Sequence, residues 1–339
     1  MTFVKRMKDI RNYSLLQHNT FGIDARCNRY LEYGSVEDAI RVASILKSEQ
    51  KPFIIIGEGS NLLLTRDFDG IVVHSVMKGI SFDGCRMLCA SGEVWDDVVV
   101  RSLEHECYGL ENLSIIPGDV GASAVQNIGA YGIDAQTFIS RIYTVEIATG
   151  KMPVFSWEDC RYGYRDSRFK HEWKNRYLIT AVEFELTRMF FPRLGYGNVS
   201  AELERKGINQ PTAWQVRDTI IELRNAKLPD PNIIGNAGSF FMNPVVGREK
   251  FEQLLALYPK MPHYNIDEGH EKIPAGWMIE QCGWKGKSLG RAGVHDKQAL
   301  VLVNRGGATG EEIVTLCRQI QHDVKDKFGI EIHPEVNIV

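Results

Sequence analysis

The segment from Ile116 to Gly132 contains four glycines, three alanines and one serine within one short stretch. A glycine costs about 0.5–1 kcal/mol relative to alanine in regular structure, because it loses more backbone freedom on folding. Small side chains also add little to a hydrophobic core. The segment is therefore predicted to be a loop whose backbone lies close to another group. Gln126 and Asn127 add amides that can pair with the edge of a heterocycle, so a bound ligand is favoured over a buried crossing of two loops.

Length and composition are those of a globular protein with more than one domain. The 339 residues are enough for two or three domains, each with its own core. Apolar residues make up 44% of the chain and charged residues 24%, as in ordinary globular proteins. The formal net charge of -3 gives no general attraction to nucleic acid or to an anionic membrane. We therefore expect neither partner, and we expect any anionic ligand to be bound by a local cluster of donors.

The N-terminal segment and the cysteines predict a cytoplasmic protein. Met1–Arg11 is charged and lacks the apolar core of a signal peptide, and no stretch has the ~18 apolar residues of a spanning helix. The seven cysteines are scattered and include no Cys-x-x-Cys pair, so they are interpreted as reduced thiols. Neither they nor the nine histidines show zinc-type spacing, so no metal site is predicted.

Periodicity and capping patterns predict both helices and strands. Ser35-Val-Glu-Asp38 resembles a capping box and begins a helix that runs to about Glu49. Thr309-Gly-Glu-Glu312 is a second capping box, and its helix ends at Gly329. Further helices are predicted at about 94–105 and 213–226, and strands at 53–56, 71–74, 87–90, 143–147, 178–186 and 331–339. Because apolar and polar residues alternate in 178–186, we expect one face of that strand to be solvated.

A shorter glycine-containing loop, Gly57-Glu-Gly-Ser-Asn61, directly follows the predicted strand 53–56. Its glycines permit positive φ and let a ligand approach, and its N–H groups can form an anion-binding nest. The third glycine of the Rossmann fingerprint is missing. The loop is either part of a ligand site or an ordinary turn.

The run from Arg161 to Lys170 carries four basic residues interleaved with aromatic ones. A solvated basic face is the ordinary explanation of such a run. The aromatic residues favour burial of some of these side chains, and a buried arginine can form two parallel hydrogen bonds to a carboxylate. We therefore predict that Arg165 binds a carboxylate.

Ser239 follows a glycine-rich turn and precedes Phe240 and Phe241. We predict that the aromatic rings wall the serine hydroxyl into a dry pocket, where it donates a proton. No Gly-x-Ser-x-Gly elbow is present, which disfavours an acyl-transfer nucleophile, and a helix or turn cap is the structural alternative. Glu335 is a lone acid in an apolar terminal segment, either an exposed edge carboxylate or a site residue.

These motifs, in this order, resemble those of the UDP-N-acetylenolpyruvoylglucosamine reductases, flavoenzymes that complete UDP-N-acetylmuramate for peptidoglycan. The resemblance runs from about Asn19 to the C-terminus and includes Arg224-Asn-Ala-Lys-Leu-Pro-Asp-Pro231. The stretch Phe190–Asn198 resembles the extra substrate-covering loop of the longer, type I members. Three positions depart from residues that are common in the family: Glu58 for glycine, Ala124 for proline and Met242 for lysine. The first two would alter the FAD loops slightly, and the third would weaken a contact to the anionic part of the substrate.

The resemblance implies an α+β fold, with a two-lobed FAD-binding domain of the vanillyl-alcohol-oxidase (PCMH) type and an α+β substrate-binding domain. Lobe 1 would comprise residues 1–69, lobe 2 residues 70–224 and the substrate domain residues 225–330. The whole PCMH-type domain would span about 19–188. The tail 331–339 would return as a strand to the FAD-binding body.

The resemblance also assigns site residues by position. Catalytic roles fall on Arg165, Ser239 and Glu335. The two loops are assigned to FAD through Gly57, Glu58, Gly59, Ser60, Asn61, Pro117, Gly118, Gly121, Ala122, Ser123, Gln126, Asn127, Gly129, Ala130, Tyr131 and Gly132. The UDP-sugar is assigned to Tyr164, Tyr196, Lys227, Asn243 and Gln298.

The implied reaction is the ping-pong reduction of the enolpyruvyl group of UDP-N-acetylglucosamine-enolpyruvate. Hydride would pass from NADPH through FAD to the vinyl carbon. Arg165 and Glu335 would hold the charge that develops on the carboxylate, and Ser239 would protonate the adjacent carbon. The missing Rossmann fingerprint fits a nicotinamide that shares the substrate pocket, and we expect a monomer.

Two alternatives stay open. One is a flavin-dependent oxidase of another alcohol or sugar, which would consume oxygen and not NADPH. The other is a non-catalytic sugar-nucleotide-binding protein, which would show no flavin spectrum after addition of FAD.

Overall fold

The computed structural model describes residues 7–339, which form two compact units built from interleaved segments of the chain. The first unit contains the residues up to Tyr13 together with Cys27–Glu58 and Phe68–Arg224. The second contains Ser14–Arg26, Gly59–Asp67 and Asn225–Val339. Residues 1–6, part of the segment in which we expect no signal peptide, lie outside the described part of the chain.

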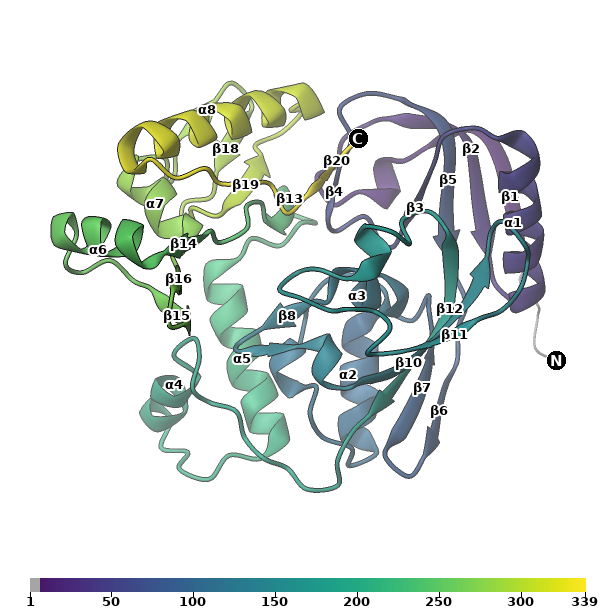
Figure 1. Cartoon of the computed structure of the whole chain (residues 1–339), viewed down its shortest axis with the longest axis horizontal. Helices are drawn as coiled ribbons and strands as arrows, with labels where there is room; N and C mark the ends of the chain where they lie inside the picture. The colour runs from purple at the N-terminus through teal and green to yellow at the C-terminus, as the bar shows by residue number, and fades with distance from the viewer. Residues whose placement is uncertain (1–6) are drawn as a thin grey trace. The chain divides into compact units, whose positions relative to one another are not determined.

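The first unit is built on two larger sheets and a short hairpin (Figure 1). In the four-stranded sheet, the last three strands are parallel, in the order β1 (Lys8–Ser14), β2 (Arg26–Tyr33), β5 (Phe68–Ser75), β3 (Phe53–Ile56). The five-stranded sheet is antiparallel, in the order β11 (Val154–Ser156), β10 (Ile139–Glu146), β12 (Tyr177–Glu185), β7 (Arg86–Ala90), β6 (Ile80–Asp83). The hairpin pairs β8 (Gly129–Ala130) with β9 (Ile133–Asp134).

Five helices accompany these sheets, and the predicted helices are confirmed. They are α1 (Val36–Glu49), α2 (Trp95–Glu104), α3 (Val120–Gln126), α4 (Val199–Arg205) and α5 (Ala213–Lys227). At the start of α1, the Ser35 hydroxyl accepts the N–H of Asp38 at 3.1 Å, as its capping pattern predicts. The buried side of α1 packs with residues of β2, β5, β10 and β12 in one core cluster, so this helix ties the two sheets of the unit together.

Strand β12 differs from its prediction, because neither of its faces is solvated. It lies between β10 and β7, and most of its residues are buried. The polar Glu183 is itself only 8% exposed, and its carboxylate accepts hydrogen bonds from the hydroxyls of Ser140 (2.8 Å) and Tyr143 (3.3 Å). The alternation in sequence therefore reflects a buried, hydrogen-bonded acid and not exposure to water.

The second unit contains a four-stranded sheet, a three-stranded sheet and a two-stranded ladder. The first has the order β13 (Gly235–Ser239), β19 (Val301–Asn304), β18 (Ala292–Val294), β17 (Ser288–Leu289), and the second β14 (Val245–Gly247), β16 (His270–Lys272), β15 (Tyr264–Asp267). The ladder is parallel and joins β20 (Asn337–Ile338) to β4 (Leu62–Leu63). The α-helices of the second unit are α6 (Arg248–Leu257), α7 (Ala275–Gln281) and α8 (Gly310–Phe328). Most of the tail 331–339 lies outside regular strands, so the predicted terminal strand is confirmed only over Asn337–Ile338.

Helix α8 carries the capping box that its sequence predicts. The Thr309 hydroxyl accepts the N–H of Glu312 at 3.2 Å, and the Glu312 carboxylate accepts the N–H of Thr309 at 2.8 Å. Gly329 ends the helix in the left-handed conformation, with φ at 63°. Both ends therefore satisfy main-chain groups that a helix leaves without partners.

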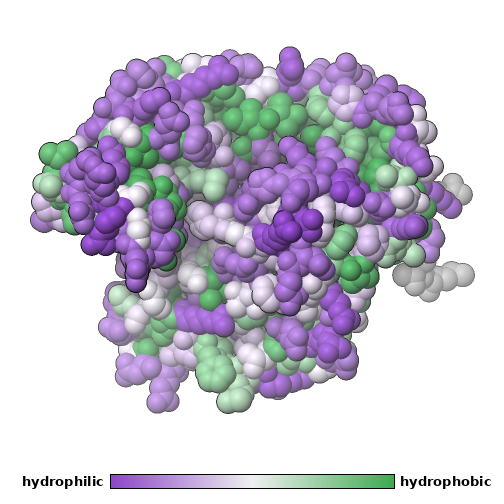
Figure 2. Space-filling model, in the orientation of Figure 1, coloured by the Kyte–Doolittle hydropathy of each residue, from purple (hydrophilic) through white to green (hydrophobic). Residues whose placement is uncertain are grey.

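Hydrophilic residues cover most of the visible face of the molecule, with hydrophobic residues scattered between them (Figure 2). Within residues 7–339, no helix combines the length and the apolar character that crossing a bilayer requires.

Replacing the capping threonine tests the account of α8. Thr309→Ala removes one half of the capping box and should lower the free energy of unfolding by about 1 kcal/mol, measured by urea denaturation followed by circular dichroism. The matched control is Thr315→Ala, an exposed threonine inside the same helix, which should change stability little. Equal losses in the two variants would contradict the capping role.

Candidate functional site

The predicted site residues are divided between the two units. The first unit holds Gly57, Glu58, Pro117, Gly118, Gly121, Ala122, Ser123, Gln126, Asn127, Gly129, Ala130, Tyr131, Gly132, Tyr164, Arg165 and Tyr196. The second holds Gly59, Ser60, Asn61, Lys227, Ser239, Asn243, Gln298 and Glu335.

The small-residue loop 116–132 contains a helix that the sequence did not predict. Its residues 120–126 form α3, which ends at Asn127 in the left-handed conformation. The buried Asn127 amide donates to the carbonyl of Gly163 at 2.7 Å, and its oxygen accepts the N–H of Gln136 at 3.0 Å. The Ser167 hydroxyl donates to the carbonyl of Val125 at 2.6 Å. The loop is thus tied to the Arg161–Lys170 run through side-chain bonds to main-chain groups.

Arg165 lies against the same loop. Its guanidinium donates to the carbonyl of Gly129 and, at 3.5 Å, to that of Asn127. Its backbone is in the left-handed region, with φ at 55°, and its carbonyl accepts a hydrogen bond from the Lys170 ammonium at 2.8 Å. A Cβ on Gly129 would lie 2.5 Å from Nη1 of Arg165, so this glycine makes room for the guanidinium. The structure therefore brings the predicted carboxylate-binding residue to the predicted cofactor loop.

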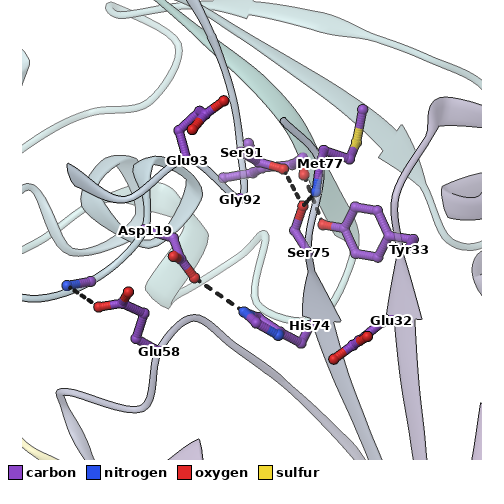
Figure 3. Close-up of polar contacts among 12 residues, drawn as sticks. Glu32, Tyr33, Glu58, His74, Ser75, Met77, Ser91, Gly92, Glu93 and Asp119 are labelled. Atoms are coloured by element: carbon purple, nitrogen blue, oxygen red, sulfur yellow. Dashed lines mark hydrogen bonds and ion pairs between the residues drawn. The ribbon is translucent and has the colours of Figure 1, made fainter. Parts of the chain in front are cut away.

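The loop 57–61 meets the small-residue loop at Gly57 and Glu58. A Cβ on Gly57 would lie 3.0 Å from Cβ of Ala122 and 3.1 Å from Oδ2 of Asp119. The Glu58 carboxylate accepts the N–H of Gly118 at 3.0 Å, while Asp119 contacts Nε2 of His74 at 3.2 Å (Figure 3). Burial, and then the neighbouring Asp119 carboxylate, raise the pKa of Glu58.

Two N–H groups of the small-residue loop already have hydrogen-bond partners within the protein. The N–H of Gly118 bonds to Glu58, and the N–H of Gly121 donates to the carbonyl of Ser91 at 2.8 Å. A side chain and a neighbouring strand end therefore already accept these two N–H groups. A phosphate at Gly118 would have to displace the Glu58 carboxylate.

Tyr196 lies beside the end of the small-residue loop. A Cβ on Gly132 would lie 3.2 Å from Cβ of Tyr196, and one on Gly197 would lie 2.6 Å from Cδ1 of Tyr131. The buried Asn112 amide joins the two segments, since it donates to the carbonyls of Tyr131 (3.0 Å) and Arg193 (2.9 Å). A residue predicted for the substrate thus lies next to residues predicted for the cofactor.

Arg224 is a candidate that the residue-by-residue prediction missed, although it opens a motif quoted for the resemblance. Its Nη2 donates to the carbonyl of Ile115 at 3.4 Å, while its Nε is buried with no hydrogen-bond partner among the described residues. Burial lowers the pKa of Arg224, and the charge of Arg165 acts in the same direction. A buried donor beside a second arginine suits an anionic or carbonyl-rich ligand. A lone arginine at the end of a helix gives no such signal in sequence.

In the second unit the structure brings Ser239 and Glu335 to neighbouring segments. The N–H of Glu335 donates to the carbonyl of Phe240 at 2.8 Å, and the N–H of Met242 donates to that of His333 at 2.9 Å. The Asn61 amide donates to the carbonyl of Glu335 at 3.3 Å. Three segments that are distant in sequence therefore meet around the predicted proton donor and the terminal acid.

The surroundings of Ser239 differ from the prediction. Its side chain is exposed, whereas Phe240 and Phe241 are 0% and 1% exposed. Phe240 packs edge-on against Phe21 and Phe241, so the rings fill the core of the unit instead of walling the hydroxyl. The register shift between Asn236 and Ser239 in the ladder of β13 with β19 interrupts strict alternation, which the sequence did not reveal.

Asn243 and Gln298 each lie near the start of α7. The Asn243 side chain accepts the N–H of Ala275 at 2.9 Å, and a Cβ on Gly276 would lie 3.0 Å from the Gln298 amide oxygen. Gln298 is close in sequence to Leu300, whose carbonyl accepts the N–H of Phe240 at 2.8 Å. Lys227 is exposed at the end of α5.

Comparison with known proteins places this geometry in a family. A family model described as an FAD binding domain matches residues 28–154, and one described as UDP-N-acetylenolpyruvoylglucosamine reductase, C-terminal domain, matches residues 230–339. The UDP-N-acetylenolpyruvoylglucosamine reductase of Bacteroides fragilis (strain YCH46) is 50% identical over 97% of this chain and 99% of its own length. The chain belongs to the UDP-N-acetylenolpyruvoylglucosamine reductase family. The predicted family is thereby confirmed.

Solved structures agree on the fold. The UDP-N-acetylenolpyruvylglucosamine reductase of Thermus caldophilus matches with a TM-score of 0.69 at 19% identity, over 98% of each chain. The 6-hydroxy-D-nicotine oxidase of Arthrobacter nicotinovorans matches with a TM-score of 0.54 at 12% identity, over 97% of this chain and 88% of that one. Together with the FAD binding domain match, these likenesses confirm the α+β fold class with an FAD-binding part of the family's type.

The buried Glu58 makes stability depend on pH. Because its pKa is raised on folding, folding binds a proton, and stability is lost as pH rises from the ordinary value of 4.5 through the raised one. Glu58→Gln should therefore be more stable than the native protein near neutral pH, with the difference vanishing below that ordinary value. Urea titrations at a series of pH values measure this. The exposed Glu158→Gln is the control, and a gap of the same size at low pH would refute the account of Glu58.

Proposed function

We propose that this chain catalyses the NADPH-dependent reduction of UDP-N-acetylglucosamine-enolpyruvate to UDP-N-acetylmuramate, a step in the synthesis of peptidoglycan precursors. Membership of the family supports the activity. The observation that carries the residue assignment is the main-chain pairing of Glu335 with Phe240 at 2.8 Å, which sets the terminal acid beside Ser239. This pairing would allow Ser239 and Glu335 to contact the same substrate.

The first unit fits FAD by the chemistry of its donors. Arg224 has a buried Nε without a hydrogen-bond partner among the described residues, and the loop beside Arg165 is rich in glycine and alanine. We propose that residues 57–61 and 116–132 hold FAD, with Arg224 as a further donor. When bound, FAD supplies the two-electron redox chemistry that takes hydride from NADPH and passes it on.

The chain's own residues then stabilise charge and move a proton. Arg165 and Glu335 would bind the carboxylate of the enolpyruvyl group as negative charge develops there, and one such donor is typically worth ~2.7–4 kcal/mol. A carboxyl group such as that of Glu335 can bind another carboxylate only when a proton is held or shared between them. The hydroxyl of Ser239 would protonate the neighbouring carbon, a general-acid contribution of about 10²–10⁴-fold. Its exposure in the structure means that the bound substrate itself must exclude water from the hydroxyl.

The remaining assignments follow from the same proposal. Tyr164, Tyr196, Lys227, Asn243 and Gln298 would bind the UDP-sugar, and NADPH would occupy the same pocket in turn. The FAD-binding lobes would lie in residues 1–224 and the substrate domain in 225–330. We propose a monomer that works in the cytoplasm on small molecules, without nucleic acid or membrane as partner.

Separate half-reactions test the role of Ser239. Ser239→Ala should leave reduction of bound flavin by NADPH nearly intact and slow reoxidation by the enolpyruvyl substrate by about 10²–10⁴-fold, both followed by anaerobic stopped-flow absorbance. Ser239→Cys retains a proton donor and should recover part of the rate, and the exposed Ser81→Ala should behave as the native protein. Equal slowing of both half-reactions in Ser239→Ala would show that the serine is structural.

A further inference from the structure

Two cysteines that the proposed site does not use lie side by side in the first unit. The sulfur atoms of Cys85 and Cys107 are 2.8 Å apart, although 22 positions separate them in sequence. Cys85 is half-buried, Cys107 is fully buried, and both are free thiols. The other five cysteines of the chain are also free thiols. What sets Cys85 and Cys107 apart is the contact between their sulfur atoms.

Main-chain hydrogen bonds fix both cysteines in place. Cys85 lies in the turn between β6 and β7, and its carbonyl accepts the N–H of Leu186 at 3.0 Å. Cys107 follows α2, and its N–H donates to the carbonyl of Ser102 at 2.9 Å. The next residue, Tyr108, pairs with Thr187 in both directions. Main-chain hydrogen bonds among three segments, namely the β6–β7 turn, the residues after α2 and residues 186–187, therefore hold the two cysteines next to each other.

The side chain of Arg188 bonds to two of these segments. The guanidinium of Arg188 donates to the carbonyl of His105 and, at 3.4 Å, to that of Gly84, the residues near Cys107 and before Cys85. Burial, and then the bond to Cys85, raise the pKa of Cys107 to about 11, so its sulfur stays protonated until a partner reacts. The more accessible Cys85 is thus the sulfur that reacts first.

We propose that Cys85 and Cys107 form a reversible disulfide when the protein meets a hydroperoxide. The Cys85 thiolate attacks a peroxide oxygen, the O–O bond breaks, and hydroxide leaves to give a sulfenic acid. The Cys107 sulfur then attacks the Cys85 sulfur, the S–O bond breaks, and water leaves as the S–S bond forms. The two thiols lose two protons and two electrons, and hydrogen peroxide is reduced to two waters.

The cross-link would join the β6–β7 turn to the end of α2. Strand β6 and helix α2, which lead into these two segments, line a cavity of about 550 Å³ whose wall includes Phe82 stacked on His105, with ring centroids 3.9 Å apart. Closing a loop restricts the unfolded chain, so the oxidised protein should melt at a higher temperature than the reduced one. The difference should disappear after treatment with dithiothreitol.

The test exposes the purified full-length protein to hydrogen peroxide. We expect the loss of two titratable thiols, a mass lower by two hydrogen atoms, and a non-reducing peptide map that joins the peptides of Cys85 and Cys107. Cys85→Ser should abolish the cross-link. Cys107→Ser should leave a sulfenic acid on Cys85 that dimedone traps. Cys282→Ser, which removes another half-buried thiol, should cross-link as the native protein does.

Three results would overturn the proposal. The first is added oxygen on Cys85 in the native protein without loss of the Cys107 thiol. The second is a cross-link between other cysteines, and the third is a cross-link that survives in Cys85→Ser. None of these readouts depends on FAD or on turnover, so a failed cross-link and a failed reductase assignment are distinguishable.

Discussion

The main chain of the small-residue loop is held by side chains that come from another part of the sequence. Ser167 and Arg165 donate to carbonyls of the loop, and Asn127 within the loop donates to the carbonyl of Gly163. A buried carbonyl left without a donor costs about 1–3 kcal/mol, so these bonds decide which path the loop can take. Arg165 therefore has two duties: it supports the loop and it presents a positive charge beside it. The proposed FAD and carboxylate sites depend on the same guanidinium.

The second unit uses main-chain pairing for a similar purpose. Glu335 donates from its backbone to Phe240, and the parallel ladder of β20 with β4 carries the tail past Asn61. Backbone bonds fix where these residues lie without occupying the hydroxyl of Ser239. Two phenylalanines that follow the serine anchor the segment in the core. The proposed proton donor is thus positioned by the buried residues that follow it in sequence, and not by aromatic rings around its hydroxyl.

Local patterns predicted much of the fold, because capping and periodicity act over a few residues. The ends of α1 and α8 follow from Ser35, Thr309 and Gly329, and the predicted strands other than the terminal one fall close to their predicted ranges. What failed depends on distant neighbours. Helix α3 lies where glycine content predicted a loop, and β12 is buried because its residues join two core clusters, one with α3 and one with α1. The exposure of Ser239 accompanies a register shift in its strand pairing. The burial of Nε of Arg224 depends on residues that are distant in sequence and pack around it. The family-derived residue assignments remain predictions that only function can test.

The claim on which the account rests is that the chain binds FAD and uses it to pass electrons from NADPH to an enol ether. The direct measurement is the visible absorption spectrum of the native protein with FAD under anaerobic conditions, first with NADPH and then with UDP-N-acetylglucosamine-enolpyruvate. The account predicts that NADPH bleaches the flavin band and that the nucleotide sugar restores it without oxygen. A flavin that NADPH leaves unchanged, or a reduced flavin that only oxygen reoxidises, would contradict it.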